Sequence, residues 1–161
     1  MGRNVRTLTM KMLNEFVIKG SPDTATAQQK GLRIVRGHAQ FYEKKEVTRA
    51  KEELADALLC YVPDEPYTGK LYLRVMWLFS KKSLSNAENL TFKESRPDLD
   101  NLIKSVADVM TGCGFWEDDS QIVKLDLQKG WNKMTPGLYV QIIGLEPDDY
   151  NELVGNWRAY E

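Results

Sequence analysis

Two groups of acidic residues in the middle of the chain carry side chains suited to binding a metal ion. The stretch RPDLDN places Asp98 and Asp100 two positions apart, and the stretch WEDDSQ adds Glu117, Asp118 and Asp119. Two or three convergent carboxylates suit Mg²⁺, which prefers hard oxygen ligands and often completes its shell with waters and a substrate phosphate. Such an ion activates a bound water and offsets charge on a phosphodiester. The residue types therefore point to phosphodiester hydrolysis.

A helix expected over residues 99–110 would position the first pair. At about 100° per residue, its apolar side chains share one face. They are Leu99, Leu102, Ile103, Val106 and Met110, with Val109 beside them. Asp100, Lys104 and Asp108 fall on the opposite side. Lys104 thus lies one turn from Asp100, where its ammonium group would steady a phosphate or an attacking hydroxide. Gly112 and Gly114 are expected to close the helix.

An ordinary structural interpretation competes with the metal site. Asp98 or Asp100 could cap the helix, and Asp100 with Lys104 could form an exposed ion pair. Against this, the chain supplies two carboxylates where a cap needs one, and Pro97 stiffens the approach to the helix. A helix of about 12 residues spans roughly 18 Å, so a following strand can double back toward its start. Whether Asp119 then reaches Asp98 is left open by the sequence.

Several other kinds of site are excluded. Leu102 and Ile103 break the ligand pattern of an EF-hand. One histidine, His38, and two distant cysteines, Cys60 and Cys113, do not make a zinc site or a disulfide framework. The chain contains no P-loop, no dinucleotide-binding fingerprint and no nucleophile elbow.

Periodicity predicts the elements that surround the acids. Alternation over residues 70–80 puts Leu71, Val75 and Phe79 on one face and indicates a central strand. The other expected elements are strands at 12–19, 121–129 and 137–144, an extended piece at 32–42, helices at about 47–60 and 147–158, and loops at 20–31 and 81–95. Together they predict an α+β fold in a single domain over residues 1–161, a mixed β-sheet with helices packed against one face.

The composition of the chain indicates the cellular compartment and the kind of partner to expect. No apolar run approaches the roughly 20 residues that a membrane span needs, and the start of the chain lacks the apolar centre of a signal peptide. A cytoplasmic protein is therefore expected. Residues 1–50 carry ten lysines and arginines against four acids, and the remainder carries twelve against nineteen. A basic face beside an acidic centre suits a protein that holds a polyanion and a cation, although chance clustering gives the same counts.

The stretch RPDLDNLIKSVADVMTGCGFWEDDSQIVKL, residues 96–125, closely resembles the core of the RusA family of Holliday-junction resolvases. The family pattern is a P-D-x-D-N helix start with a lysine one turn on, then a short turn, an aromatic residue and D-D-x-Q followed by Val or Ile. Every element of this pattern is present. The N-terminal part resembles more divergent members, and the net charge of −1 departs from the basic character of the family.

The resemblance implies a RusA-like fold and a homodimeric endonuclease that cuts four-way DNA junctions in recombination and repair. It implies Mg²⁺ as cofactor, with Mn²⁺ as a substitute, and no organic cofactor. Carried over by position, the catalytic residues are Asp98, Asp100, Asp119 and Lys104. The three aspartates are the metal ligands, and Asp118 is an additional candidate ligand. A twofold dimer would place one metal site on each of two opposed strands.

Candidate DNA contacts are cations near the acids in the sequence and in the basic first third. They are Lys81, Lys82, Lys93, Arg96, Arg33, Arg36, Lys129 and Lys133. For each one, a solvated surface charge is an equally good interpretation. Phe115 and Trp116 are expected in the core rather than as wedges between bases. Two other functions stay open: a non-catalytic protein that binds branched DNA, and a Mg²⁺-dependent enzyme acting on small nucleotides.

Overall fold

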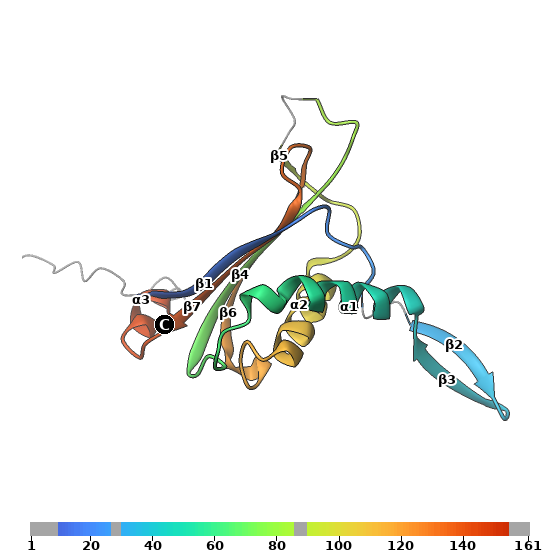
Figure 1. Ribbon diagram of the computed structural model, residues 1–161, viewed down its shortest axis with the longest axis horizontal. Coiled ribbons are helices and arrows are strands. Elements are labelled where there is room, and N and C mark those ends of the chain that lie inside the picture. Colours follow the sequence, from blue (N-terminus) through green and yellow to red (C-terminus); the bar gives the residue numbers. More distant parts are fainter. Residues whose placement is uncertain (1–9, 27–29, 86–89, 155–161) are drawn as a thin grey trace, which may run out of the picture.

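The computed structural model describes residues 10–26, 30–85 and 90–154, and within them a five-stranded sheet forms the body of the protein (Figure 1). The strands are β1 (Lys11–Lys19), β4 (Lys70–Phe79), β5 (Leu90–Phe92), β6 (Ile122–Asn132) and β7 (Gly137–Leu145). Their order across the sheet is β1-β7-β4-β6-β5. The sheet is mixed, because β4 runs parallel to β6 and antiparallel to β7. The predicted α+β fold is confirmed.

The middle strand, β4, has the predicted alternation. Leu71, Val75 and Trp77 are buried on the face that carries the main apolar core. Strand β4 is parallel to β6, and a parallel pair needs a crossover connection. The long segment between them, which includes β5 and a helix, supplies that crossover.

Two helices cover one face of the sheet (Figure 1). They are α1 (Lys45–Leu58), which continues into the short helix η1 (Leu59–Tyr61), and α2 (Leu99–Cys113). The predicted apolar face of α2 packs into the core with Leu58 and the β4 side chains. Gly114 ends α2 in the left-handed region, at φ 90°, whereas Gly112 lies inside the helix and does not help to close it.

The C-terminal part of the described chain contains a helix that starts two residues later than predicted. Helix α3 covers Asp149–Val154, and the rest of the predicted segment 147–158, including Trp157, lies partly outside the described residues. Among the helices that the structure describes, none is long and apolar enough to cross a membrane.

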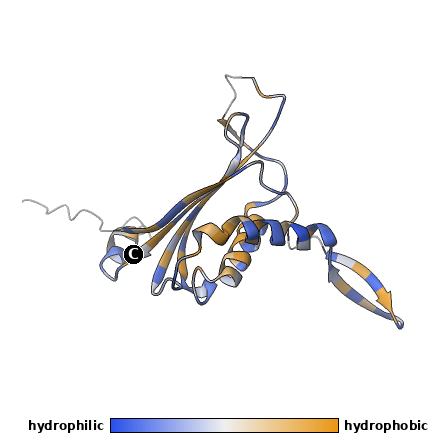
Figure 2. Cartoon of the chain, in the orientation of Figure 1, coloured by the Kyte–Doolittle hydropathy of each residue, from blue (hydrophilic) through white to orange (hydrophobic). Residues whose placement is uncertain are grey.

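The extended piece predicted at residues 32–42 is two strands, β2 (Lys30–Val35) and β3 (His38–Glu43), paired as an antiparallel hairpin. Arg36 and Gly37, both with positive φ, form the turn between them. The hairpin projects from the body of the protein (Figure 1), and Ile34 and Phe41 are exposed on it. Figure 2 shows the apolar residues along both strands.

The predicted polar loop at residues 81–95 contains an unpredicted strand, β5, which pairs with the end of β6. The two strands approach closely at Gly130, where an added Cβ would lie 2.8 Å from the carbonyl oxygen of Thr91. Glycine therefore permits this pairing, and β5 brings the following loop to the start of α2.

The face of the sheet away from α1 and α2 is polar across four strands. Arg74 Nε donates to Asp126 Oδ2 at 3.1 Å, and its Nη1 donates to Gln141 Oε1 at 2.9 Å. Gln141 Nε2 in turn donates to Glu15 Oε1 at 2.6 Å. Within the described residues, α1 and α2 therefore pack on the opposite, apolar face, as predicted.

Candidate active site

The segment that leads into α2, residues 93–98, is called the entry loop below. A buried lysine organises it. Lys93 is only 5% exposed. Its Nζ donates to the Ser95 carbonyl oxygen at 3.0 Å, to Ser95 Oγ at 2.6 Å and to the Arg96 carbonyl oxygen. This burial contradicts the prediction that Lys93 contacts DNA. Its ammonium group folds the loop instead.

A second lysine holds the entry loop from the sheet. Lys129, on β6, donates from Nζ to the Ser95 carbonyl oxygen at 3.1 Å and to the Pro97 carbonyl oxygen at 2.7 Å. The Lys93 ammonium also lies over the rings of Trp131 and Phe79, at 4.6 and 5.3 Å from the centroids. Burial lowers the pKa of Lys93, and the nearby charge of Lys129 lowers it further. Both lysines therefore fix the backbone that presents Asp98.

The first acidic pair stands exposed at the start of α2. Asp98 is the N-cap residue, but its side chain makes no capping hydrogen bond. Asp100 lies in the first turn, and Lys104 is exposed one turn later. The helix N-terminus adds partial positive charge beside the carboxylates. The capping role that competed with the metal interpretation is thus not taken by Asp98.

A buried acceptor lies next to this pair. Asn101 Oδ1 is buried and has no hydrogen-bond partner among the described residues. An unsatisfied buried acceptor costs about 1–3 kcal/mol, so such atoms are rare in native structures. A water held by a bound cation would supply the missing donor, and the carboxylates of Asp98 and Asp100 are the hard oxygen ligands that Mg²⁺ prefers. The residues at the start of α2 therefore fit a divalent cation.

The second acidic group is shaped by a capping box in η3 (Asp119–Gln121). Ser120 N donates to Asp118 Oδ1 at 2.8 Å, which lowers the pKa of Asp118. Gln121 Oε1 accepts from the Asp118 backbone, and Gln121 Nε2 donates to the carbonyl oxygens of Tyr67 and Gly69 at 3.0 and 3.1 Å. Asp118 thus has a local structural role, and the glutamine of the motif ties the turn to the start of β4.

Asp119 has a different position in this turn. It is the first residue of η3, it is exposed, and it is not part of the capping box. The aromatic residues ahead of it, Phe115 and Trp116, are fully buried in the core, as predicted. They fix the turn on the body of the protein and leave the Asp119 carboxylate facing solvent.

The two acidic groups lie at opposite ends of α2. The strand after the helix does double back, as expected, but Asp119 precedes this strand and so lies at the far end of the helix. In the described parts of the chain, no three His, Cys, Asp or Glu side chains are placed to hold one metal ion. One chain therefore brings Asp98, Asp100 and Lys104 together and leaves Asp119 apart.

The predicted DNA contacts divide by location. Arg96 is exposed in the entry loop, Lys81 and Lys82 are exposed just after β4, and Lys133 is exposed beyond the end of β6. The Nζ atom of Lys81 lies 5.3 Å from the centroid of the Trp131 ring. Arg33 and Arg36 lie on the projecting hairpin. Apart from Lys93, these residues stay predictions as DNA contacts.

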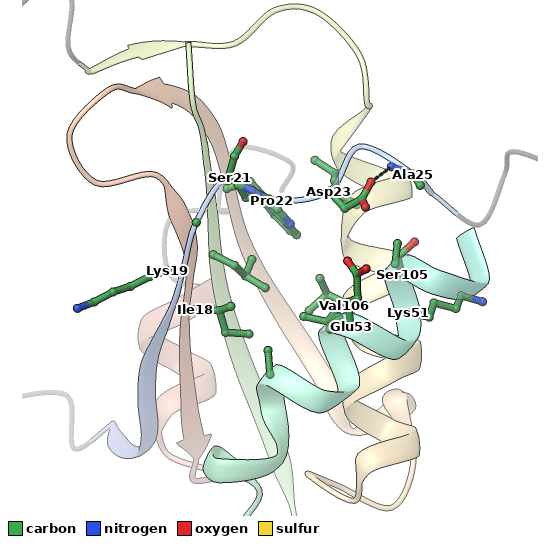
Figure 3. Close-up of a pocket in the computed structure, with 17 residues that line it drawn as sticks. Ile18, Lys19, Ser21, Pro22, Asp23, Ala25, Lys51, Glu53, Ser105 and Val106 are labelled. Atoms are coloured by element: carbon green, nitrogen blue, oxygen red, sulfur yellow. Dashed lines mark hydrogen bonds between the residues drawn. The ribbon is translucent and has the colours of Figure 1, made fainter. Parts of the chain in front are cut away.

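A hollow of about 250 Å³ lies between the end of β1, α1 and α2 (Figure 3). Its lining is mainly apolar, with Ile18, Leu54 and Leu102, and Asp23 stands at its rim, where an ion pair joins it to Arg49 at 3.6 Å. None of the predicted catalytic residues lines it. The candidate site is thus an exposed surface rather than a cavity, as suits a polymeric substrate.

We expect Lys93→Met to be less stable than the wild type by about 1–3 kcal/mol at pH 7, because three acceptors lose a charged donor. The difference in the free energy of unfolding between the wild type and Lys93→Met should grow with pH. The folded wild type binds fewer protons than the unfolded chain between the lowered pKa of Lys93 and its ordinary value of 10.5, so its stability rises in that window. Urea unfolding from pH 7 to 10.5 measures both effects.

Lys19→Met is the matched control for this experiment. Lys19 is exposed, and its side chain points away from the cavity in Figure 3. Its removal should change stability by no more than about 0.5 kcal/mol. Equal stability of the Lys93→Met protein and this control at every pH would contradict the role given to Lys93.

These features define a class of protein. An α+β body presents exposed carboxylates beside exposed cations, which is the equipment of an enzyme that hydrolyses nucleic-acid phosphodiesters. Residues 21–143 match the family model for endodeoxyribonuclease RusA, and the chain belongs to this family. It is also 35% identical over 120 residues to the crossover junction endodeoxyribonuclease rusA of Lactococcus phage r1t, covering 74% of this chain and 88% of the phage protein. The resemblance seen in residues 96–125 is confirmed.

Proposed function

We propose that this protein is a structure-specific endonuclease that resolves four-way DNA junctions in recombination and repair. It would act in the cytoplasm as a homodimer that makes paired cuts. Membership of the RusA family carries this proposal, and the relative from Lactococcus phage r1t is named for the same activity. The exposed aspartates at the start of α2, held there by the entry loop, supply a chemical basis for it.

Asp98 and Asp100 would hold Mg²⁺, for which Mn²⁺ would substitute. When bound, the cation activates water and offsets charge on the phosphate. Their carboxylates are exposed, and Asp98 is free of a capping bond. Lys93 and Lys129 donate hydrogen bonds to carbonyl oxygens of the entry loop. These bonds would fix the backbone that carries the carboxylates before DNA binds. Preorganised charge of this kind is a large part of catalysis.

The reaction is a hydrolysis. The oxygen of water forms a bond to phosphorus, the bond to one sugar oxygen breaks, and that oxygen takes up a proton. The products are a phosphate monoester and a hydroxyl. Lys104, one turn from Asp100, would stabilise the additional negative charge on the phosphate oxygens in the transition state. Asp119 is assigned to the same reaction by its place in the family motif.

A synthetic four-way junction with each strand labelled in turn tests the proposal. In Mg²⁺, we expect cuts at symmetry-related positions in two opposed strands. A linear duplex of the same sequence should stay intact, and so should the junction in EDTA. Binding without cleavage in both Mg²⁺ and Mn²⁺ would favour a non-catalytic protein for branched DNA. Hydrolysis of small nucleotides instead of the junction would favour a Mg²⁺-dependent enzyme that acts on small nucleotides.

Binding to the junction should weaken steeply with salt. Contacts to about six phosphates would lower affinity about 10³-fold between 50 and 200 mM salt. Lys82→Met, at an exposed position just after β4, should reduce the slope of log affinity against log salt by about 1, and Lys19→Met should leave it unchanged. Gel-shift titrations at several salt concentrations give the slopes. A slope near zero for the wild type would contradict binding through phosphates.

A further inference from the structure

The β2–β3 hairpin has one face that is entirely apolar. In its antiparallel register, Leu32 lies opposite Phe41 and Ile34 lies opposite Ala39. Side chains that are opposite each other, or two positions apart in a strand, point to the same side. These four residues therefore form one surface, called the apolar face below. Leu32, Ile34 and Phe41 are 60%, 77% and 71% exposed on it.

The side chains on the other face of the hairpin contact one another. Arg33 Nε donates to Gln40 Oε1 at 3.0 Å, and the Arg33 guanidinium lies 5.7 Å from the centroid of the Tyr42 ring. The Tyr42 ring lies over Gly31, where an added Cβ would be 2.2 Å from it. A two-stranded hairpin is only marginally stable alone, and an exposed apolar patch marks an interaction site. A partner is therefore expected to cover the apolar face.

The base of the hairpin is attached to α1. Glu43 Oε1 accepts from Lys51 Nζ at 2.7 Å, and Glu43 Oε2 accepts from Thr48 Oγ1 at 3.3 Å. The hydrogen bond from Lys51 lowers the pKa of Glu43, so this carboxylate is ionised at neutral pH. These bonds give the hairpin a defined direction as it projects beyond the start of α1 (Figure 1).

The charge of the hairpin indicates which partner it fits. Residues 30–45 contain a single acid, Glu43, which is paired with Lys51. Against it stand five cations, Lys30, Arg33, Arg36, Lys44 and Lys45. Two such segments would repel each other, whereas a polyanion would be attracted. The charge therefore favours DNA over a second copy of the chain.

The hairpin lies within reach of DNA bound at the start of α2. Ala50 of α1 and Leu102 of α2 line the same hollow. Lys44, at the base of the hairpin, is six residues before Ala50, and Asp98 is four residues before Leu102. These separations correspond to about 9 Å and about 6 Å of helix. With about 10 Å between packed helices, the two points are within roughly 25 Å, a distance that DNA covers in about seven base pairs.

The chemistry of the apolar face indicates which part of DNA it would contact. Its side chains carry no hydrogen-bonding groups, so they cannot bind phosphates or read base edges by hydrogen bonds. The flat faces of the bases are apolar, and stacking covers them in a continuous duplex. They become accessible where the stack is interrupted, as at the branch point of a junction. Apolar and aromatic side chains stack on such bases.

We propose that the apolar face of the β2–β3 hairpin stacks on bases exposed at the branch point of a four-way junction, with Phe41 as the main contact. The cations around it would bind the flanking phosphates. This inference rests on the proposed function, because it takes the junction as the DNA that is bound. It adds that the preference for branched over linear DNA resides in the hairpin, apart from the carboxylates that cut.

The affinities of an Ile34→Ser/Phe41→Ser variant for a junction and for a linear duplex test the proposal. Both are measured in EDTA by fluorescence anisotropy. Junction affinity should fall at least about 10-fold, because the stacking contact is lost. Duplex affinity should stay within about twofold of the wild type, since every cation that binds phosphates is kept. Phe41→Trp, which keeps an aromatic ring, should retain the preference for junctions.

Leu59→Ser/Tyr150→Ser is the matched control. These side chains are 65% and 67% exposed and lie outside the hairpin, so their replacement should change neither affinity. Unchanged junction affinity of the hairpin variant, or an equal loss on junction and duplex, would overturn the inference. A change in its oligomeric state in light scattering would also overturn it, because a second copy would then cover the apolar face. Unchanged melting temperatures exclude unfolding.

Photocrosslinking tests the same contact in the wild-type protein. A 5-iodouracil base at the branch point should crosslink to Phe41 on irradiation, as identified by mass spectrometry, and the same base at the end of an arm should not. The absence of a crosslink to the hairpin would overturn the inference while the proposed function stands. A wild type that crosslinks at Phe41 and prefers junctions, but does not cut them, would remove the proposed function and leave the hairpin contact.

Discussion

Asp100→Asn should abolish junction cleavage while leaving junction binding unchanged or tighter. The carboxylate stands exposed in the first turn of α2. Losing a metal ligand removes several kcal/mol of transition-state stabilisation, so the rate should fall at least about 100-fold at 1.36 kcal/mol per tenfold. The substitution also removes a negative charge beside the DNA phosphates, which favours binding. Single-turnover cleavage and gel-shift titration measure the two effects separately.

Asp108→Asn is the matched control for this prediction. Asp108 lies on the same exposed side of α2, two turns further on. The substitution changes the net charge equally but leaves the start of the helix intact, so cleavage should stay close to the wild-type rate. Equal rates for Asp100→Asn and Asp108→Asn would show that Asp100 is not a catalytic residue. Unchanged melting temperatures of both variants would exclude unfolding as the cause.

Trp116→Ala should destabilise the protein by about 3–5 kcal/mol, the usual cost of removing a large buried aromatic side chain. The indole is 1% exposed, and its Nε1 donates to Thr111 Oγ1 at 2.7 Å. It therefore joins the end of α2 to the turn that carries Asp119. For a domain with a total stability of about 5–15 kcal/mol, this is a large fraction. Urea unfolding followed by circular dichroism gives the difference.

The control for this prediction is an aromatic side chain outside the core. Phe92, on β5, is 84% exposed. Its replacement by alanine should change the free energy of unfolding by no more than about 0.5 kcal/mol. Trp116→Phe should lie between the two, because it keeps most of the packing and loses the hydrogen bond to Thr111. A Trp116→Ala variant as stable as Phe92→Ala would contradict the structural role of the indole.

The sequence predicts the buried elements well because their side chains must repeat with the period of the backbone. Strand β4 and helix α2 each bury a regular face, and their predicted residues lie in the core. The hairpin and β5 are less predictable. The turn at Arg36 places a non-glycine residue at φ 51°, which the residue type does not indicate. Strand β5 has three exposed residues, and only its pairing with Gly130, Trp131 and Asn132 of β6 defines it.

The candidate site is predicted in its residues but not in its geometry. The motif identifies Asp98, Asp100 and Lys104, and the structure places them together at one end of α2. The roles of Lys93 and Lys129 are not visible in the sequence. Their hydrogen bonds are accepted by backbone carbonyl oxygens, which every residue has, so no residue type indicates them. Lys129 is also 32 positions from its partner Pro97. Asp118 and Asp119 are adjacent, identical in type and both exposed, so only the fold shows that Asp118 caps the turn and Asp119 does not.

Strand β6 fixes the distance between the two acidic groups of the chain. It begins at Ile122, three positions after Asp119, and Lys129 near its other end holds the loop that presents Asp98. A hydrogen-bonded strand does not stretch, so the distance between the two acidic groups is set by a residue count. Adding or removing two residues would change it by about 7 Å and keep every side chain on its face, whereas a change of one would turn the side chains over.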